Sequence, residues 1–188
     1  MKEGNFNFAV DSQLISELGE RLVTSNYIAL SELIKNAYDA DSPTVTITLV
    51  NISDDTIDDN LRKIVIEDTG VGMTTSDIEN YWMTIATPHK ANKPRSLKFG
   101  RPTTGNKGIG RFACQKLAKK LIIETCSVNG SKYEHTKVTF DWDKFEPGLK
   151  VEKVPCEYES RMTGDGVSGV KLSLIGLRDR WTNRDFQM

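Results

Sequence analysis

The fold is set by one stretch of the chain, Ala29-Leu30-Ser31-Glu32-Leu33-Ile34-Lys35-Asn36-Ala37-Tyr38-Asp39-Ala40. With 3.6 residues per helical turn, Glu32, Asn36 and Asp39 fall on one narrow stripe of a helix. The apolar residues of the opposite side are expected to face the core: Leu30, Ile34 and Ala37. The stretch therefore predicts a helix with a polar stripe on one side and an apolar surface on the other.

This polar stripe combines a carboxylate, an amide and a second carboxylate. An amide oxygen can bind a hard cation such as Mg²⁺. A carboxylate one turn away can polarise a water molecule. A solvated helix face explains the same three residues, so the stripe alone leaves both interpretations open.

A second polar segment follows a predicted strand and reads Asp68-Thr69-Gly70-Val71-Gly72-Met73. An ionised aspartate only accepts hydrogen bonds, so Asp68 can bind an exocyclic amine such as that of adenine. The two glycines allow positive φ or close approach of the backbone to a ligand, and Met73 offers an adaptable apolar surface. A simple turn is the alternative. An aspartic protease is disfavoured, because Val71 stands where Ser or Ala is usual and the motif occurs once.

A glycine-rich segment, Gly105-Asn106-Lys107-Gly108-Ile109-Gly110-Arg111, precedes a predicted helix. The free N–H groups and the dipole of a helix N-terminus favour phosphate. Lys107 and Arg111 add positive charge at the same place. The segment is not a Rossmann motif, because a loop and not a strand precedes it, and it lacks the Gly-Lys-Ser/Thr of a Walker loop.

Taken together and in this order, the three segments resemble the ATP-binding boxes of the GHKL superfamily, which includes gyrase B subunits, ninety-kilodalton heat-shock chaperones, histidine kinases and MutL. The resemblance covers nearly the whole chain and implies an α+β protein with the Bergerat fold. That fold is a two-layer α/β sandwich with a mixed, mainly antiparallel sheet. We therefore expect residues 1–188 to form a single ATP-binding domain with an ATP lid at about 85–107.

The resemblance also implies roles for individual residues. Glu32 matches the group that activates the attacking water, and Asn36 matches the magnesium ligand. Asp68 matches the carboxylate that reads adenine. The remaining positions of the implied nucleotide site are Asp39, Gly70, Gly72, Met73, Gly105, Lys107, Gly108, Ile109 and Gly110.

Two features place the chain within the superfamily. Glu32 stands where histidine kinases usually have Asn, which favours the hydrolytic branch. The segment 82–87 is similar to the same region of heat-shock chaperones and microrchidia-type ATPases. One position departs from the pattern, because Val170 stands where many members have a Thr that joins the adenine network. Either Ser168 or Ser173 compensates, or the adenine end is less polar than usual.

Composition excludes several classes of protein. The 188 residues carry a net charge of −1 and are 38% hydrophobic, which is typical of a globular domain. No apolar run approaches the roughly 20 residues of a membrane span, and the N-terminus lacks the pattern of a secretory signal. The odd count of three cysteines indicates reduced thiols in a cytoplasmic protein.

Positive charge gathers in residues 80–123, which contain ten Lys or Arg and no acid. Such a stretch either contacts an anionic partner or forms a solvated basic surface. Direct binding of nucleic acid is not indicated, because Phe99 and Phe112 are the only rings between residues 87 and 120 and stacking partners are therefore few.

Hydrophobic periodicity predicts the remaining elements. Helices are expected at about 12–24, 27–40 and 75–84, and another that begins near Gly110. Strands are expected at 45–50, 62–67, 120–126, 134–140 and 168–175. The chain ends in sequence that still looks structured, so we expect the N-terminal fragment of a longer protein.

The predicted function is magnesium-dependent binding and hydrolysis of ATP that drives conformational change in a larger protein. The resemblance implies an ATP-dependent homodimer and downstream domains as partners. Relatives usually take a cation for the γ-phosphate from a following domain, so slow turnover is expected in isolation. A protein-kinase ATP domain and a nucleotide-sensing module without significant hydrolysis remain as alternatives.

Overall fold

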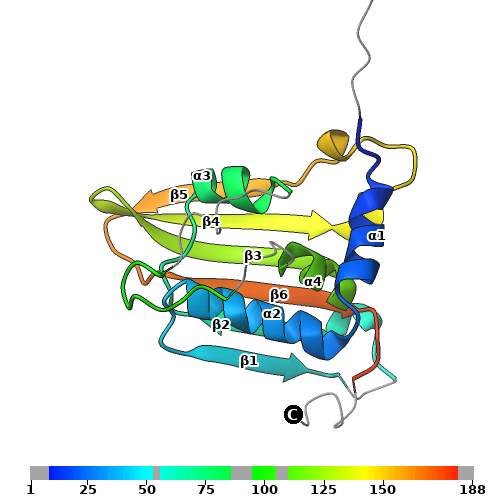
Figure 1. The fold of residues 1–188 in the computed structure, drawn as a ribbon, viewed down its shortest axis with the longest axis horizontal. Coiled ribbons are helices and arrows are strands. Elements are labelled where there is room, and N and C mark those ends of the chain that lie inside the picture. Colours follow the sequence, from blue (N-terminus) through cyan, green and yellow to red (C-terminus); the bar gives the residue numbers. More distant parts are fainter. Residues whose placement is uncertain (1–8, 53–55, 86–94, 105–109, 182–188) are drawn as a thin grey trace, which may run out of the picture.

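The computed structural model describes residues 9–52, 56–85, 95–104 and 110–181. Six antiparallel strands form one sheet in the order β1-β2-β6-β3-β4-β5 (Figure 1). Their bounds are β1 Val45–Val50, β2 Lys63–Asp68, β3 Ala118–Asn129, β4 Lys132–Asp141, β5 Tyr158–Thr163 and β6 Gly169–Leu177. This arrangement confirms the predicted α+β class with a mainly antiparallel sheet.

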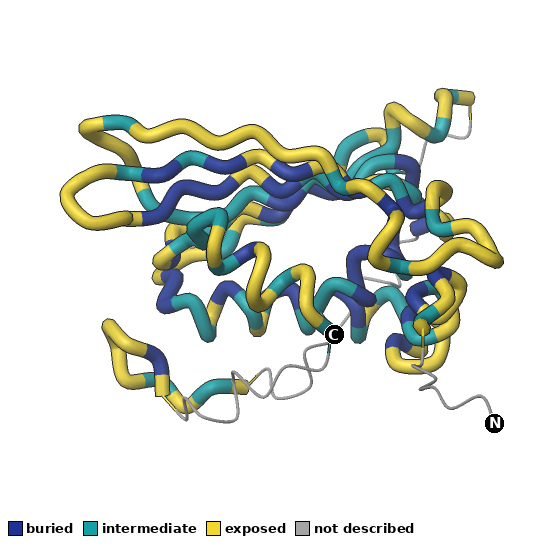
Figure 2. The backbone as a smooth tube through the Cα atoms, turned by 90° about the horizontal axis from the view of Figure 1, so that it is seen from above, coloured by how far each residue is buried: buried dark blue, intermediate teal, exposed yellow. Residues whose placement is uncertain are grey.

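Helices cover one face of this sheet and make the second layer (Figure 2). The longer helices are α1 Gln13–Leu22, α2 Asn26–Asp39 and α4 Gly110–Leu117. A short helical segment combines α3 Thr75–Asp77 with η2 Ile78–Trp82, a π-helical turn. Three 3₁₀ turns connect other elements: η1 Asp59–Leu61, η4 Trp142–Lys144 and η5 Val151–Lys153.

The core lies between the two layers. Alternate residues of each strand point to opposite faces of a sheet, and one set is buried here against the helices. It includes Ile64, Ile66, Leu121, Ile123, Leu172 and Leu174. On α2 the fully buried apolar residues are Ala29, Leu30, Leu33 and Ala37. Leu30 and Ala37 are buried as predicted, and Ile34 packs against the core while partly buried. Leu33 is buried in addition.

Sequence periodicity found every major element except β5. Five of the six residues in this edge strand are exposed, so it lacks the apolar alternation that marks a half-buried strand. The helix that begins at Gly110 ends at Leu117, and Lys119 and Lys120 belong to β3.

Several cations of the basic stretch are paired within the domain. Lys116 contacts Asp179 at 3.1 Å, Lys119 contacts Asp59 at 3.7 Å, and Lys120 contacts Asp141 at 3.6 Å. Exposed pairs of this kind contribute about 0–1 kcal/mol each. For these three lysines the solvated-surface interpretation therefore holds. The described helices include none that is long and apolar enough to cross a membrane.

A buried carboxylate fastens α3 to the sheet. Glu134 on β4 is only 7% exposed. It accepts hydrogen bonds from the Thr75 amide at 3.0 Å, the Asn129 side chain at 2.7 Å and the Ser160 hydroxyl at 3.3 Å, and also from the Thr75 hydroxyl. The hydrogen bond from the Thr75 side chain, supported by the others and opposed by burial, lowers the pKa of Glu134.

We expect Glu134→Gln to lower the free energy of unfolding by about 1–3 kcal/mol at neutral pH, because an amide nitrogen then faces donors that need an acceptor. The folded pKa of Glu134 lies below its unfolded value, so its stabilisation is present above the unfolded pKa and is lost as pH falls through the folded pKa. In urea unfolding, the difference in unfolding free energy between wild type and variant should therefore become smaller in acid. Glu159→Gln, on exposed β5, is the control and should change stability by less than about 0.5 kcal/mol.

Candidate functional site

Two of the predicted segments meet where α2 packs against α4. Asn36 on α2 faces Gly110, the first residue of α4. A Cβ placed on Gly110 would lie 2.3 Å from Asn36 Nδ2, which is closer than two atoms can approach. The Asn36 amide therefore occupies the space that any larger residue at position 110 would need.

The Asp68 segment forms a tight turn at the end of β2. The Gly70 amide donates to Asp68 Oδ1 at 2.8 Å, and the Val71 amide donates to the Ala40 carbonyl at 2.9 Å. Burial raises the pKa of the Asp68 carboxyl and outweighs the hydrogen bonds from the amides of Gly70 and Val170, which lower it. The turn thus presents a largely desolvated carboxylate next to the C-terminus of α2.

The following residues are fastened to β3. The Met73 amide donates to Thr125 Oγ1 at 2.8 Å, and the Thr125 hydroxyl lies 3.1 Å from the Gly169 carbonyl. Gly72 has φ +70°, and a Cβ there would lie 1.9 Å from the Cys126 carbonyl oxygen. Only glycine suits this position, because its backbone lies directly against another backbone.

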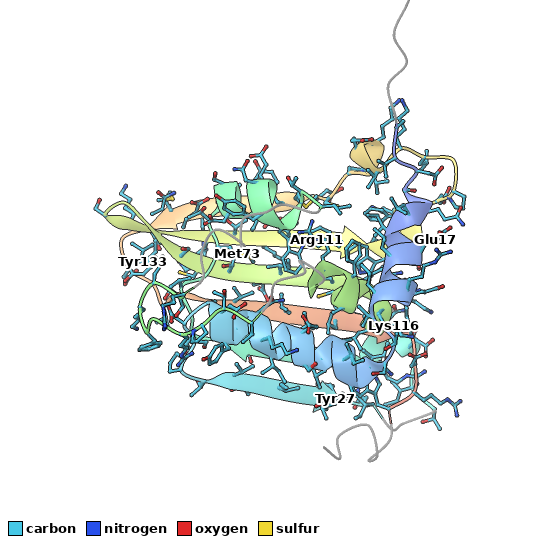
Figure 3. All side chains as sticks on the ribbon, viewed as in Figure 1. Glu17, Tyr27, Met73, Arg111, Lys116 and Tyr133 are labelled. Carbon is cyan, nitrogen blue, oxygen red and sulfur yellow. The ribbon has the colours of Figure 1, made fainter. Side chains whose placement is uncertain are left out.

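A cavity of about 440 Å³ lies between the helix layer and the sheet. Its lining brings together six of the predicted residues. Asn36 and Asp39 come from α2, Asp68, Gly72 and Met73 from the Asp68 segment, and Gly110 from the start of α4. Apolar walls come from Leu33, Ala37, Ile66, Val71, Trp82, Val170 and Leu172. Met73 lies on the side of this region nearer the β3–β4 hairpin, and Arg111 lies by α4 (Figure 3). A largely apolar hollow with a few fixed polar groups is typical of a small-molecule site.

Other predicted residues lie apart from this lining. Gly70 supports Asp68 through its amide but does not border the cavity. Gly105, Lys107, Gly108 and Ile109 lie outside the described residues. Glu32 does not border the cavity either, and its carboxylate pairs with Lys35 Nζ at 2.8 Å.

Asp39 holds a part of the predicted lid. Its Oδ1 accepts hydrogen bonds from the Thr104 amide at 2.8 Å and the Thr104 hydroxyl at 3.0 Å. Two residues further on, Asp41 accepts from the amides of Lys98 and Phe99 at 2.7 and 3.1 Å. Residues 95–104 are therefore anchored to the C-terminal end of α2, and the rest of the predicted lid beyond Ile85 lies outside the described residues.

Arg101 strengthens this anchor. Its guanidinium donates to the Ser42 carbonyl at 2.8 Å and stacks on the rings of Tyr38 and Phe99 at 4.8 and 4.6 Å from their centroids. Burial opposes ionisation of Asp41, but hydrogen bonds, first that of Ser96, outweigh it and lower the pKa. The expectation that positive charge in residues 80–123 serves an anionic partner therefore does not apply to Arg101.

Val170, the position that departs from the family pattern, borders the cavity beside Asp68. Ser173 pairs with Val65 and Ile122 and, by strand alternation, points to the other face of the sheet. Ser168 borders a different hollow. Neither serine therefore borders the cavity that Val170 lines.

Sequence reasoning missed several polar residues of the lining, among them Ser127 and Tyr81. The Ser127 hydroxyl donates to the Val71 carbonyl at 2.9 Å, and Tyr81 and Arg111 border the same cavity. Ser127 carried no signal in the sequence, because its place depends on the register of β3. Arg111 did carry one, since it directly follows the glycine-rich segment.

A second hollow of about 560 Å³ lies over the opposite face of the sheet. Its charged lining residues include Glu67, Glu124, Lys137, Glu159, Arg161 and Lys171. Those on β2, β3, β4 and β6 alternate with buried residues along their strands. Of the predicted site residues only Asp68 borders it, so we place the candidate site in the cavity next to the helices.

The donors present fit a magnesium ion that is shared with a ligand. Among the described residues no three His, Cys, Asp or Glu side chains lie close enough to hold a metal by themselves. Mg²⁺ is commonly bound by one or two protein oxygens together with waters and substrate phosphates. The Asn36 side chain beside the N-terminus of α4 could provide one such oxygen.

Comparison with protein-family models finds a match over most of the chain. A profile of the histidine kinase-, DNA gyrase B- and HSP90-like ATPases matches residues 23–163, which is more than half of the chain.

Individual relatives include chaperone protein HtpG of Bacillus subtilis, 27% identical over 168 residues and 81% of this chain, and HtpG of Clostridium acetobutylicum, 28% identical over 165 residues and 81%. A putative type II restriction enzyme, HgiDII of Herpetosiphon aurantiacus, is 27% identical over 126 residues and 67% of this chain. The chain spans 25% of the length of each HtpG and 19% of HgiDII.

We expect Gly72→Ala to lower the free energy of unfolding by about 2–5 kcal/mol. Alanine is strained at the positive φ of this position, and its Cβ would collide with the Cys126 carbonyl. Gly130→Ala is the matched control, since Gly130 also has positive φ but open space around its Cα. It should cost only about 1–2 kcal/mol. Equal losses in urea unfolding would contradict the close approach at Gly72.

Proposed function

This chain belongs to the histidine kinase-, DNA gyrase B- and HSP90-like ATPase family, and on that premise we propose that its cavity binds ATP with Mg²⁺ and hydrolyses it. The observation that carries the proposal is the convergence of three separate sequence segments on one cavity. Asp68 lies 32 positions after Asn36, and Gly110 lies 42 positions after Asp68. All three nevertheless border the cavity.

The Asp68 end of the cavity suits the adenine base. The carboxylate accepts hydrogen bonds when ionised and can take one from the exocyclic amine of the ring. Met73, Val170 and Leu172 offer apolar surface for the flat faces. Val170 cannot donate or accept a hydrogen bond, so base recognition relies on Asp68.

The Asn36 and Gly110 end suits the phosphates. Free N–H groups at the N-terminus of α4 and the dipole of that helix favour an anion. Asn36 would hold Mg²⁺, which when bound offsets phosphate charge. The triphosphate would thus run from Asp68 towards the start of α4.

Glu32 is the proposed general base. It lies one turn before Asn36 on α2, so both side chains project from the same side of that helix. Its ion pair with Lys35 occupies one carboxylate oxygen. To act on water, Glu32 needs a side-chain rotation towards the phosphates.

The Glu32–Lys35 pair also favours a second candidate function. A carboxylate that pairs with a neighbouring ammonium and does not border the cavity is compatible with binding without turnover. In that case the domain would act as a nucleotide-dependent switch. In either case the bound state would drive conformational change or dimerisation of a larger protein.

Calorimetric titration with a non-hydrolysable ATP analogue tests the binding proposal. We expect magnesium-dependent binding that Asp68→Asn weakens by about 10- to 100-fold, because an amide N–H then faces the donor of the base. Glu67→Gln is the control, since this neighbour points to the opposite face of the sheet, and it should bind like wild type. Equal affinity of Asp68→Asn and wild type would rule out Asp68 as the base-binding residue.

Turnover separates the two candidate functions. We expect Glu32→Gln to reduce ATP hydrolysis by at least about 100-fold through loss of the general base, while its affinity for the analogue stays near that of wild type. Glu17→Gln on α1 is the matched control, because Glu17 also pairs with a cation on its own helix, Arg21 at 3.8 Å. Wild type that binds ATP but releases no phosphate supports the switch instead.

A further inference from the structure

Arg111 is a half-buried cation that has no acidic partner among the described residues. Its Nη2 donates to the Tyr81 carbonyl at 2.8 Å. Its Nη1 is buried and, within the part of the chain that the structure describes, has no hydrogen-bond partner. None of the ion pairs between described residues includes Arg111. Burial lowers the pKa of its guanidinium.

An unpaired N–H of a buried charged group is costly. Leaving such a donor unsatisfied costs about 1–3 kcal/mol or more when the group is charged. Native proteins rarely keep such a group without a reason, and an unrecorded ligand is one of the usual reasons. The position of Nη1 therefore calls for an acceptor that the described residues do not provide.

The carboxylates of the cavity do not serve as that acceptor. Four aspartates border it: Asp39, Asp41, Asp68 and Asp77. Each already accepts hydrogen bonds from elsewhere, from Thr104, from the amides of Lys98 and Phe99, from Gly70 and from Thr74 respectively. Arg111 thus borders the cavity with a donor that has no partner, while the nearby carboxylates are engaged.

Arg111 also lies at the phosphate end of the cavity. It directly follows Gly110, which contacts Asn36, and it borders the same hollow. Arg95, the other described arginine of the lining, is exposed and donates to the Gly100 carbonyl. Of the two described arginines of the lining, Arg111 is therefore the more buried one.

We propose that Arg111 binds the phosphate chain of the nucleotide, donating from Nη1 to a phosphate oxygen while Nη2 keeps its bond to Tyr81. The inference rests on the proposed function of the cavity. Arginine suits this role because its planar fork matches phosphate and keeps its charge when desolvated. The domain would then supply from α4 a phosphate-binding cation of its own, beside any that a following domain adds.

The bond to Tyr81 gives this contact a second consequence. Tyr81 belongs to η2, which packs on the sheet through Trp82, whose ring centroid lies 6.4 Å from that of Phe140. The guanidinium therefore joins the start of α4 to the segment that leads into the predicted lid. A phosphate at Nη1 would fix the orientation of both.

Calorimetric titration with two probes tests the inference. One probe is the non-hydrolysable ATP analogue with Mg²⁺, and the other is adenosine, which lacks phosphate. We expect Arg111→Met to lower the affinity for the analogue by about 10- to 100-fold. Its affinity for adenosine should stay within about 2-fold of that of wild type. Arg111→Lys keeps a charge but loses the fork, so it should weaken the analogue by an intermediate factor. Lys116→Met, on the same helix but paired at the surface with Asp179, should bind both probes like wild type.

Unfolding without nucleotide separates phosphate binding from a purely structural role. Arg111→Met removes a half-buried charge that has no ion pair among the described residues, so the unliganded protein should be as stable as wild type or more stable. If Arg111→Met lowered the affinity for both probes equally and also lowered the stability, Arg111 would have a structural role and the inference would be overturned. Unchanged affinity of Arg111→Met and Arg111→Lys for the analogue would also overturn it while leaving the proposed function intact. Wild type that binds neither probe would refute the proposed function, and the inference with it.

Discussion

The contact between Asn36 and Gly110 is the constraint on which the site depends. Because position 110 has no side chain, the Asn36 amide fits against the backbone at the first turn of α4. The polar side of α2 and the N-terminus of α4 therefore come together at one end of the cavity. The sheet then fixes the other end, since the Asp68 turn is held to β3 by the bond between Met73 and Thr125.

The distribution of charge around the cavity follows from the same packing. Backbone amides engage the carboxylates: Asp41 holds residues 98 and 99, and Asp68 holds its own turn. These bonds satisfy the acids within the protein. Arg111 has no such acidic partner among the described residues, so the cavity combines satisfied acids with a cation that can still donate. That balance suits an anionic ligand at one end and a neutral ring at the other.

Much of this arrangement could be predicted from the sequence, because the signals were local. The stripe on α2, the Asp68 turn and the alternating strands each follow from residue spacing, and Asn36, Asp68 and Gly110 do border one cavity. Other features depend on register between distant strands. Exposed β5 has no apolar alternation, and Ser127 and Glu134 gain their partners only when β3 and β4 pair with the rest of the fold. The state of Glu32 was also beyond local reasoning, because its pairing with Lys35 depends on side-chain rotamers.

Amide hydrogen exchange, with and without the magnesium complex of a non-hydrolysable ATP analogue, tests the central claim most directly. It distinguishes the cavity beside the helices from the larger hollow on the opposite face of the sheet. The account predicts slower exchange in residues 69–73 and 110–114 together, because one ligand spans both ends of the first cavity. Slower exchange confined to residues 159–161 and 167–169, which border the other hollow, would contradict it.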